Sequence, residues 1–313
     1  MSRLLTILSF ETGLSFDDLT RIIRTAPRRY KVFHIAKRSG GEREIAQPAR
    51  EVKLLQRVML DRVLSNLPIH PAARAYRQGV SIRDNALEHA GSGPILKMDF
   101  RDFFPSIRSE DWEWFCDKNS LFDSSDRQMS ANILFRKAKR DRILRLSIGA
   151  PSSPMVSNVL MYQFDDVVAG AAATKGIRYT RYADDITFSG QRAGMLKDML
   201  KVVEQAVSSM ARPRLHVNVE KTTFVTPKWR RTVTGVILAN NGTLSLGRDR
   251  KRLISAMTHH AMLGKLAPKE ISELTGFLGF ANSVEPEFID RLRRKYGADL
   301  IARIQKAAAL RSQ

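Results

Sequence analysis

The sequence predicts an α+β fold whose C-terminal part is helical. Up to Gly247, runs of β-branched and aromatic residues alternate with segments of helical spacing, whereas only helical patterns follow that glycine. The chain has 313 residues, 43% of them hydrophobic, which is enough apolar material for one large or two modest folded domains. We therefore expect an N-terminal helical segment over 1–29, an α+β domain over 30–246 and a helical region over 247–313.

The N-terminal elements follow from short local signals. Ser15 and Asp18 have the spacing of a capping box, and apolar residues follow at helical intervals, so a short helix is expected there. Residues 30–48 have the pattern of two strands joined by Gly40-Gly41, which predicts a basic hairpin. Residues 52–63 return to helical spacing and predict a second helix.

The middle of the chain predicts further strands and one long helix. A buried strand ending in an acid is expected over 94–100, a hairpin over 179–189 and a helix over 195–210. Three more strands are expected at 215–219, at 232–238 and, beyond an Asn-Asn-Gly turn, at 243–246.

The charge of the chain predicts an anionic polymer as its partner. Lys and Arg number 52 and Asp and Glu 32, which gives a formal net charge of +20. Nucleic acid is the leading candidate and an anionic membrane is the competing one. No segment reaches the roughly 18 uninterrupted apolar residues of a membrane span, and no lipidation signal is present, so we expect no membrane partner.

The start of the chain and its cysteine content further limit the class of protein. The apolar start soon meets Glu11 and Asp17, which is too short and too acidic for a secretory signal, so a cytoplasmic location is expected. Cys116 is the single cysteine and the six histidines are scattered, which leaves neither an internal disulfide nor zinc-finger spacing.

Two acidic sites are the main candidates for chemistry. Asp99 ends the strand expected over 94–100, and Asp184 and Asp185 lie at the tip of the hairpin expected over 179–189. Enzymes of phosphoryl transfer use such acids to hold two Mg²⁺ ions, because Mg²⁺ prefers oxygen ligands. Either site alone is weak evidence, because most Asp residues are merely solvated.

The residues around these acids resemble those of reverse transcriptases. Residues 182–185, Tyr-Ala-Asp-Asp, are similar to the Tyr-x-Asp-Asp hairpin of that family, and residues 97–107 to its first palm motif. The resemblance implies an RNA-directed DNA polymerase with right-hand architecture, with fingers and palm over 30–246 and a helical thumb over 247–313. It also implies that the carboxylates and one backbone carbonyl hold two Mg²⁺ ions, with Mn²⁺ as a substitute: Asp99, Asp184, Asp185 and the carbonyl of Phe100.

The same resemblance implies how the incoming dNTP is bound. Phe104 corresponds to the aromatic residue under the sugar, whose ring excludes a ribose hydroxyl. Phe103 and Phe104 are alternatively core residues. The motif over 149–154 is similar to the second palm motif, in which Gly149 and Ala150 lie near the nascent base pair. The family usually has Pro-Gln before this glycine, and Ser147-Ile148 here lacks that amide contact.

Four further basic residues are assigned by resemblance. Lys221, within a segment similar to the next palm motif, is expected at the triphosphate or leaving group, with a plain surface lysine as the alternative. Lys37 and Arg43 flank a segment similar to the finger loop that closes over the triphosphate. Arg77 belongs to a segment similar to the one that helps hold the template, so we list it as a template contact.

Two short elements narrow the family to retron reverse transcriptases. Asn85 and His89 match an Asn-Ala-x-x-His element, and Val233-Thr234-Gly235 matches a Val-Thr-Gly element near the thumb. The resemblance implies a structured non-coding RNA (msr–msd type) as template, priming from a 2′-hydroxyl and a short branched RNA–DNA product, with Asn85 and His89 among the RNA contacts. It further implies a companion effector protein in anti-phage defence. A buried structural His89 is the alternative.

Basic residues at the start of the thumb are candidates for gripping the duplex: Arg248, Arg250, Lys251 and Arg252. A second basic cluster over 291–295 is equally compatible with a solvated helix face. Two rivals stay open, a reverse transcriptase of the group II intron or diversity-generating lineage and a catalytically silent RNA-binding scaffold. The sequence does not fix the oligomeric state.

Overall fold

The computed structural model describes residues 2–37, 40–139 and 141–309, with side chains described through residue 306. The chain forms two compact units. Unit 1 comprises Met1–Gln78, Leu96–Phe188 and Gly194–Thr223, and unit 2 comprises Gly79–Ile95, Ser189–Ala193 and Phe224–Gln313. The last segment of unit 2 begins at Phe224, and residues 233–246 share a hydrophobic core with the C-terminal helices. The functional boundary expected at residue 247 stays a prediction. Fingers, palm and thumb stay functional predictions.

The N-terminal part of unit 1 contains two helices where the sequence predicted one. Helix α2 (Phe16–Thr25) confirms the predicted helix start at Ser15, since the Ser15 hydroxyl accepts the Asp18 N–H as an N-cap and donates to the Asp18 carboxylate. Helix α1 (Arg3–Thr12) was not predicted; it buries Leu4 and Leu8, one turn apart. A short 3₁₀ helix η1 (Ala26–Arg28) follows.

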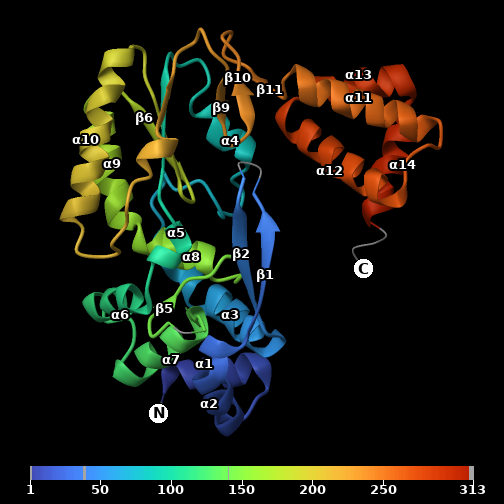
Figure 1. Ribbon diagram of the computed structural model, residues 1–313. Helices are drawn as coiled ribbons and strands as arrows, with labels where there is room; N and C mark the ends of the chain where they lie inside the picture. Colours follow the sequence, from blue (N-terminus) through green and yellow to red (C-terminus); the bar gives the residue numbers. More distant parts are fainter. Residues whose placement is uncertain (1, 38–39, 140, 310–313) are drawn as a thin grey trace. The chain divides into compact units, whose positions relative to one another are not determined.

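The predicted basic hairpin is confirmed. Strands β1 (Tyr30–Ala36) and β2 (Glu42–Pro48) pair antiparallel, and they are the two blue strands side by side in Figure 1. Most of β1 is exposed on both faces, so the hairpin depends on backbone hydrogen bonds more than on burial. The predicted helix after it is α3 (Arg50–Arg62), which buries Leu55 and Met59 and is followed by the 3₁₀ helix η2 (Leu64–Asn66).

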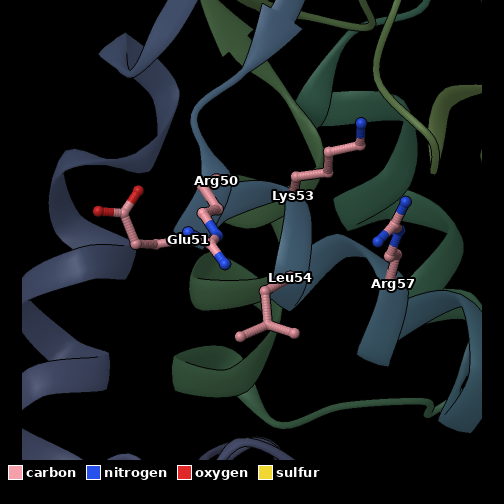
Figure 2. A pocket seen from close by; sticks show the side chains of 5 residues that line it. All are labelled: Arg50, Glu51, Lys53, Leu54 and Arg57. Carbon is pink, nitrogen blue, oxygen red and sulfur yellow. The ribbon is translucent and has the colours of Figure 1, made fainter. Parts of the chain in front are cut away.

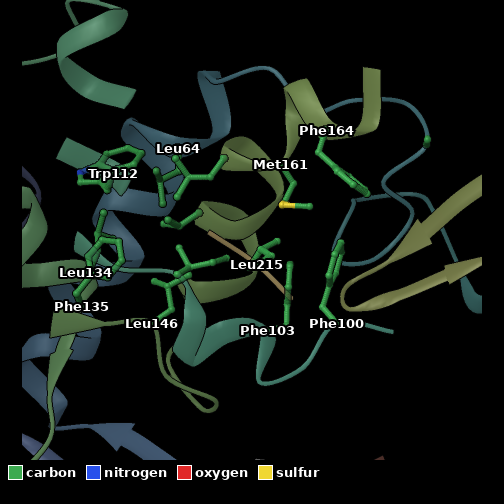
Figure 3. Close-up of a cluster of buried hydrophobic side chains, with 14 of the residues drawn as sticks. Leu64, Phe100, Phe103, Trp112, Leu134, Phe135, Leu146, Met161, Phe164 and Leu215 are labelled. Carbon is green, nitrogen blue, oxygen red and sulfur yellow. The ribbon is translucent and has the colours of Figure 1, made fainter. Parts of the chain in front are cut away.

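A continuous apolar core holds unit 1 together. Figure 3 shows aromatic and aliphatic side chains from several elements meeting there, with Phe100 and Phe103 beside Phe164, and Trp112 near Leu134. Besides α1, α2 and α3, the contributing helices are α5 (Phe103–Ser106), α6 (Ser109–Lys118), α7 (Ser124–Leu134), α8 (Ser153–Leu160), α9 (Tyr162–Ala173) and α10 (Ala193–Ser209). Two short strands, β4 (Arg136–Lys137) and β5 (Leu144–Arg145), pair antiparallel within the unit.

The sheet that carries both acidic sites has four strands in the order β6-β7-β3-β8. They are β3 (Ile95–Asp99), β6 (Arg178–Tyr182), β7 (Asp185–Ser189) and β8 (Thr223–Val225). The strand over 94–100 and the hairpin over 179–189 are thereby confirmed. Asp99 ends β3, and the tip between β6 and β7 carries Ala183 and Asp184.

The strand predicted over 215–219 is wrong. The structure has an isolated bridge between Val217 and Phe100, and then the 3₁₀ helix η3 (Val219–Lys221). Asn218 N–H donates to the Asp99 carbonyl at 2.7 Å, but the pairing ends because the partner chain turns away at Asp102, whose φ is 45°. An alternating pattern alone does not extend a strand without a partner of matching length.

Unit 2 contains a small sheet and four C-terminal helices. Helix α4 (Ile82–Leu87) lies in its first segment, and its sheet has the order β11-β10-β9. The strand predicted over 232–238 is two strands, β9 (Arg231–Val233) and β10 (Val236–Leu238), because Thr234 and Gly235 have φ of 47° and 81° and form a tight turn. The third is β11 (Leu244–Ser245).

The helical C-terminal region is confirmed. It contains α11 (Arg248–Met262), α12 (Pro268–Val284), α13 (Pro286–Tyr296) and α14 (Ala298–Ala309), coloured orange to red in Figure 1. Their apolar faces meet in one cluster that includes Ile254, Leu278 and Ile289. In the described part of the chain, none of the helices has the length and apolarity that crossing a membrane requires.

Candidate active site

A cavity of about 870 Å³ in unit 1 brings together residues that are distant in the sequence. Its lining includes Asp99 and Asp184 on one hand, and Lys37, Arg43 and Lys221 on the other. Acids and cations thus meet in one cavity, an arrangement suited to a ligand that carries phosphates and cations together.

The backbone explains why the two acidic sites are neighbours. Phe100 N–H, directly after β3, donates to the Asp184 carbonyl at 3.3 Å, which links the end of β3 to the hairpin tip. At that tip Ala183 has a φ of 58°, and the guanidinium of Arg181 donates to the Ala183 carbonyl at 3.0 Å. The turn that presents Asp184 is therefore fixed from both sides.

The carboxylates repel one another. Burial, then the charges of Asp185 and Asp99, raise the pKa of Asp184 to about 6. The pKa of Asp185 is also raised, mainly by burial, although Lys97 opposes this. Lys221 Nζ donates to both carboxylate oxygens of Asp99 at 3.0 Å, so one cation already compensates part of the negative charge.

The donor set fits a divalent cation. Carboxylate oxygens are the ligands such ions prefer, and the mutual repulsion of the acids favours an added positive charge. Within the described ranges, however, no three acidic, His or Cys side chains are drawn together as a metal-binding group. Lys221 instead holds both oxygens of Asp99. The Phe100 carbonyl as a metal ligand stays a prediction.

The two adjacent phenylalanines divide their roles. Phe103 is buried and stacks on Phe100 with ring centroids 5.7 Å apart, so it is the core residue of the pair. Phe104 is only half-buried and lines the cavity that contains Asp99 and Asp184. Phe104 therefore keeps the predicted role of excluding a ribose hydroxyl, because its side chain lies at the cavity.

The loop over 147–150 lines the cavity with only part of its residues. Gly149 has a φ of 113° and lies against β2, where an added Cβ would be 3.0 Å from the Ala46 carbonyl oxygen. Ala46 N–H donates to the Ile148 carbonyl at 2.8 Å. Ser147 and Ile148 line the cavity, whereas Gly149 and Ala150 are not among its lining residues. The glycine therefore serves packing against the hairpin.

The cavity lining includes residues that the motifs did not assign, and it does not include Arg77. Tyr76, Arg136 and Arg145 line the cavity, and a basic run over 136–140 was the signal for the second of them. Arg77, expected at the template, is not a lining residue of the cavity; its guanidinium donates to the Pro71 carbonyl at 3.2 Å. A contact of Arg77 with the template stays a prediction.

Asn85 and His89 are buried inside unit 2. Their relative exposures are 1% and 0%, and His89 Nδ1 is 2.7 Å from the Ser189 hydroxyl. In the described chain neither Nδ2 nor Oδ1 of Asn85 has a hydrogen-bond partner. Direct contact of these side chains with RNA does not fit this burial, and the alternative of a structural His89 does.

The four basic residues at the start of α11 form two pairs with different surroundings. Lys251 Nζ is 2.6 Å from the Glu285 carboxylate, and Arg250 donates to a backbone carbonyl of the β9–β10 turn at 3.1 Å. Arg248 and Arg252 are exposed. These two arginines are the better candidates for phosphate contacts, because the charges of the other two are already directed to protein groups.

A second hollow in the described surface is unsuited to catalysis. Figure 2 shows its five lining side chains, which all belong to α3: Arg50, Glu51, Lys53, Leu54 and Arg57. Glu51 is paired with Arg29 at 2.8 Å. The hollow has a single acid, so it offers no counterpart to the paired carboxylates of the larger cavity.

Comparison with known proteins agrees with this geometry. Residues 35–238 match the family model described as reverse transcriptase (RNA-dependent DNA polymerase). The chain is 37% identical to the retron Ec83 reverse transcriptase of Escherichia coli, over 96% of this chain and 98% of that one. It is 32% identical to the retron Ec86 reverse transcriptase of the same species, over 93% of this chain and 89% of that one.

A solved structure supports the fold. The structure of telomerase from Candida albicans, in complex with a fragment of telomeric RNA, matches with a TM-score of 0.50 at 13% identity. The match covers 90% of this chain and 56% of the telomerase chain. At that identity the likeness concerns the fold alone, which is the predicted α+β polymerase fold.

Enzymes with this domain generally use divalent metal ions, in agreement with the acidic cavity. The predicted assignment by motif is confirmed at the level of the family. The chain belongs to the reverse transcriptase family and, within it, to the retron-type reverse transcriptases, which are RNA-directed DNA polymerases.

Proposed function

We propose that this protein copies a cognate structured non-coding RNA of msr–msd type into a short DNA that stays branched on the RNA. Priming occurs from a 2′-hydroxyl, and each step transfers a nucleotide from a dNTP. The observation that carries the proposal is the cavity in which Asp99 and Asp184 meet Lys37, Arg43 and Lys221. Its mixed charge suits a nucleotide triphosphate with its metal ions.

Asp99, Asp184 and Asp185 are proposed to hold two Mg²⁺ ions, with Mn²⁺ as a substitute. When bound, such ions lower the pKa of the attacking hydroxyl and neutralise the charge of the leaving pyrophosphate. Lys221 can exchange Asp99 for another anion, because its ammonium group pairs with Asp99 while its side chain is 58% exposed to solvent. In the proposed reaction Lys221 leaves Asp99 and donates to a phosphate oxygen.

The walls of the cavity are proposed to position the dNTP. Arg43 lies on β2, and Lys37 directly follows β1 in the hairpin loop, from which cations can reach the phosphates. Phe104 contacts the sugar at C2′ and excludes an rNTP. Arg248 and Arg252 contact the phosphate backbone of the RNA or of the RNA–DNA duplex.

Wider context is proposed by likeness to retron enzymes. The protein is expected to act in the cytoplasm, in anti-phage defence, together with a companion effector protein. Its partners are the non-coding RNA, the RNA–DNA product and the dNTPs. The rival lineages and the silent scaffold are tested by the experiment that follows.

The proposed function predicts strong template choice. Purified protein is incubated with Mg²⁺ and dNTPs on the RNA transcribed from the DNA beside its gene, and on a shuffled RNA of the same length. DNA covalently joined to the cognate RNA alone is the expected product. Equal synthesis on both RNAs would favour a reverse transcriptase of another lineage, and binding without synthesis would favour the scaffold.

The raised pKa of Asp184 predicts that its charge destabilises the metal-free protein. The folded-state pKa of about 6 lies above the ordinary value of 3.8, so the folded state binds the proton more tightly and loses stability as pH rises through that window. We expect Asp184→Asn to stabilise metal-free protein at pH 7.5 by about 1–3 kcal/mol, or a few degrees in Tm, after allowing for solvent screening. Thermal denaturation in a chelator measures this.

The stabilisation by Asp184→Asn should shrink as pH falls from about 6 towards 4, where the wild-type carboxyl becomes protonated. Mg²⁺ should also reduce the difference in Tm between variant and wild type, because it stabilises only the wild type. Asp198→Asn is the matched control. Lys175 lowers the pKa of that exposed carboxyl, so removing the charge of Asp198 should not stabilise the protein. An Asp184→Asn protein that melts at or below the wild-type temperature at pH 7.5 would contradict the prediction.

A further inference from the structure

Tyr76 combines a strained backbone with an exposed aromatic ring. Its φ is 59°, in the left-handed region that bulky residues rarely occupy, and the residue is 51% exposed. Burial of the ring therefore does not offset the strain. Such strain persists only where the surrounding structure imposes it, and it is concentrated at functional sites.

Buried polar groups impose this backbone conformation. On one side of Tyr76, the Asn158 side chain from α8 donates from Nδ2 to the Ala75 carbonyl at 2.9 Å. Just before it, Arg74 N–H donates to the Arg181 carbonyl of β6 at 2.8 Å. Asn158 and Arg181 are both fully buried, so these bonds form away from competing water.

The same hydrogen-bond network also fixes the β6–β7 hairpin, whose tip carries Asp184. Arg181 pairs with Asp165 through two hydrogen bonds, of 2.8 and 2.6 Å, and both side chains are fully buried. Arg181 also donates to the Ala183 carbonyl at 3.0 Å and to Asn158 Oδ1 at 3.3 Å. One connected network therefore holds the carbonyl before Tyr76 and the carbonyl before Asp184.

The ring of Tyr76 lies in the active-site cavity. Tyr76 lines it with Arg43, Asp99 and Asp184, and its ring centroid is 6.5 Å from that of Tyr182 at an angle of 35°. Partial burial, and then the neighbouring Tyr182 and Asp184, raise the pKa of Tyr76. An aromatic face is thus presented beside the groups proposed to bind phosphate and metal.

We propose that Tyr76 is a stacking platform for a nucleobase at the active site, held in place by the Asn158–Arg181–Asp165 network. This rests on the proposed function, which supplies a nucleotide to the cavity. Base stacking on an aromatic ring suits a polymerase because every base has a π-face, and losing such a ring weakens binding about ten- to a hundredfold. The base belongs either to the incoming dNTP or to the template strand.

Three substitutions at Tyr76 separate the ring from the strain. Tyr76→Ala removes the ring, Tyr76→Gly removes the ring and relieves the strain, and Tyr76→Phe keeps the ring. Tyr162→Ala is the matched control, an exposed tyrosine of unit 1 outside the cavity lining. Each protein is assayed for dNTP KM and kcat, and for the Kd of a primed RNA template in the absence of dNTP.

Loss of the ring should raise one of these constants at least about tenfold in both Tyr76→Ala and Tyr76→Gly, while Tyr76→Phe restores it. A rise in dNTP KM alone assigns the base to the incoming nucleotide, and a rise in the template Kd assigns it to the template. Tyr76→Ala with both constants within twofold of wild type would overturn the proposal. So would a Tyr76→Phe protein as impaired as Tyr76→Ala, since the hydroxyl would then matter and not the ring.

The network is tested through coupling. Asn158→Ala removes the bond to the Ala75 carbonyl and the 3.3 Å bond from Arg181, but the Arg181–Asp165 ion pair remains. Replacing Asp165 would instead leave the buried Arg181 charge unpaired. If Asn158 acts by placing Tyr76, the double variant Asn158→Ala/Tyr76→Ala shows the same constants as Tyr76→Ala alone; additive losses would refute that placement. A wild-type protein that makes no DNA would refute the proposed function, while the template Kd would still test Tyr76.

Discussion

Replacing Asp184 and Asp185 together by Asn is expected to abolish DNA synthesis and to leave RNA binding intact. Asn keeps the size of each side chain but removes the negative charge that a divalent ion requires. Metal ions at such a site supply several kcal/mol of transition-state stabilisation, so synthesis should fall at least about a thousandfold. Primer extension and the Kd for the cognate RNA measure the two effects separately.

The control for this variant is Asp166→Asn, an exposed acid on α9 that is 3.9 Å from His70. It removes a charge from the same unit without touching the cavity, and synthesis should be unchanged. Synthesis retained in the Asp184→Asn/Asp185→Asn protein would refute the assignment of these residues. Loss of synthesis together with loss of RNA binding would point instead to a damaged fold, which thermal denaturation would reveal.

Phe104→Ala is expected to let the enzyme accept rNTPs. The ring of Phe104 lines the cavity, and in the proposed complex it occupies the space that a ribose 2′-hydroxyl would need. Removing it should lower the ratio of kcat/KM for dNTP over rNTP by about ten- to a hundredfold. Single-nucleotide incorporation on one template, with dGTP or GTP, measures the ratio.

Phe103→Ala provides a matched control for Phe104→Ala. Phe103 is buried against Phe100, so its truncation should lower the Tm through a cavity in the core and leave the dNTP-to-rNTP ratio of the remaining activity unchanged. An unchanged ratio in Phe104→Ala, or a changed ratio in Phe103→Ala, would contradict the assignment of the gate to Phe104.

Local signals predicted the elements that local chemistry determines. The capping box at Ser15 gave α2, and the apolar spacing over 195–210 gave α10. Elements that depend on distant partners were predicted less well. The segment over 215–219 lacks a long enough partner strand, and the segment over 232–238 is divided by the turn at Thr234 and Gly235.

In the candidate site, motifs predicted which residues belong to the cavity better than they predicted the orientation of side chains. Motifs located Asp99, Asp184, Phe104 and Lys221, which the fold brings to one cavity. A motif does not say which way a side chain points, because tertiary contacts decide that. Asn85 and His89 were therefore expected at RNA but are buried, and the guanidinium of Arg77 donates to a backbone carbonyl. Tyr76, beside Arg77, was overlooked although it lines the cavity.

The most direct test of the central claim is the nucleic acid that the protein carries when purified from cells containing its native flanking DNA. The bound material is run on a denaturing gel with and without RNase treatment, beside material from the Asp184→Asn/Asp185→Asn protein. Covalent RNA–DNA synthesis predicts a discrete DNA, absent from the variant, that migrates faster after RNase. RNA alone in the wild-type sample would contradict synthesis of a branched RNA–DNA.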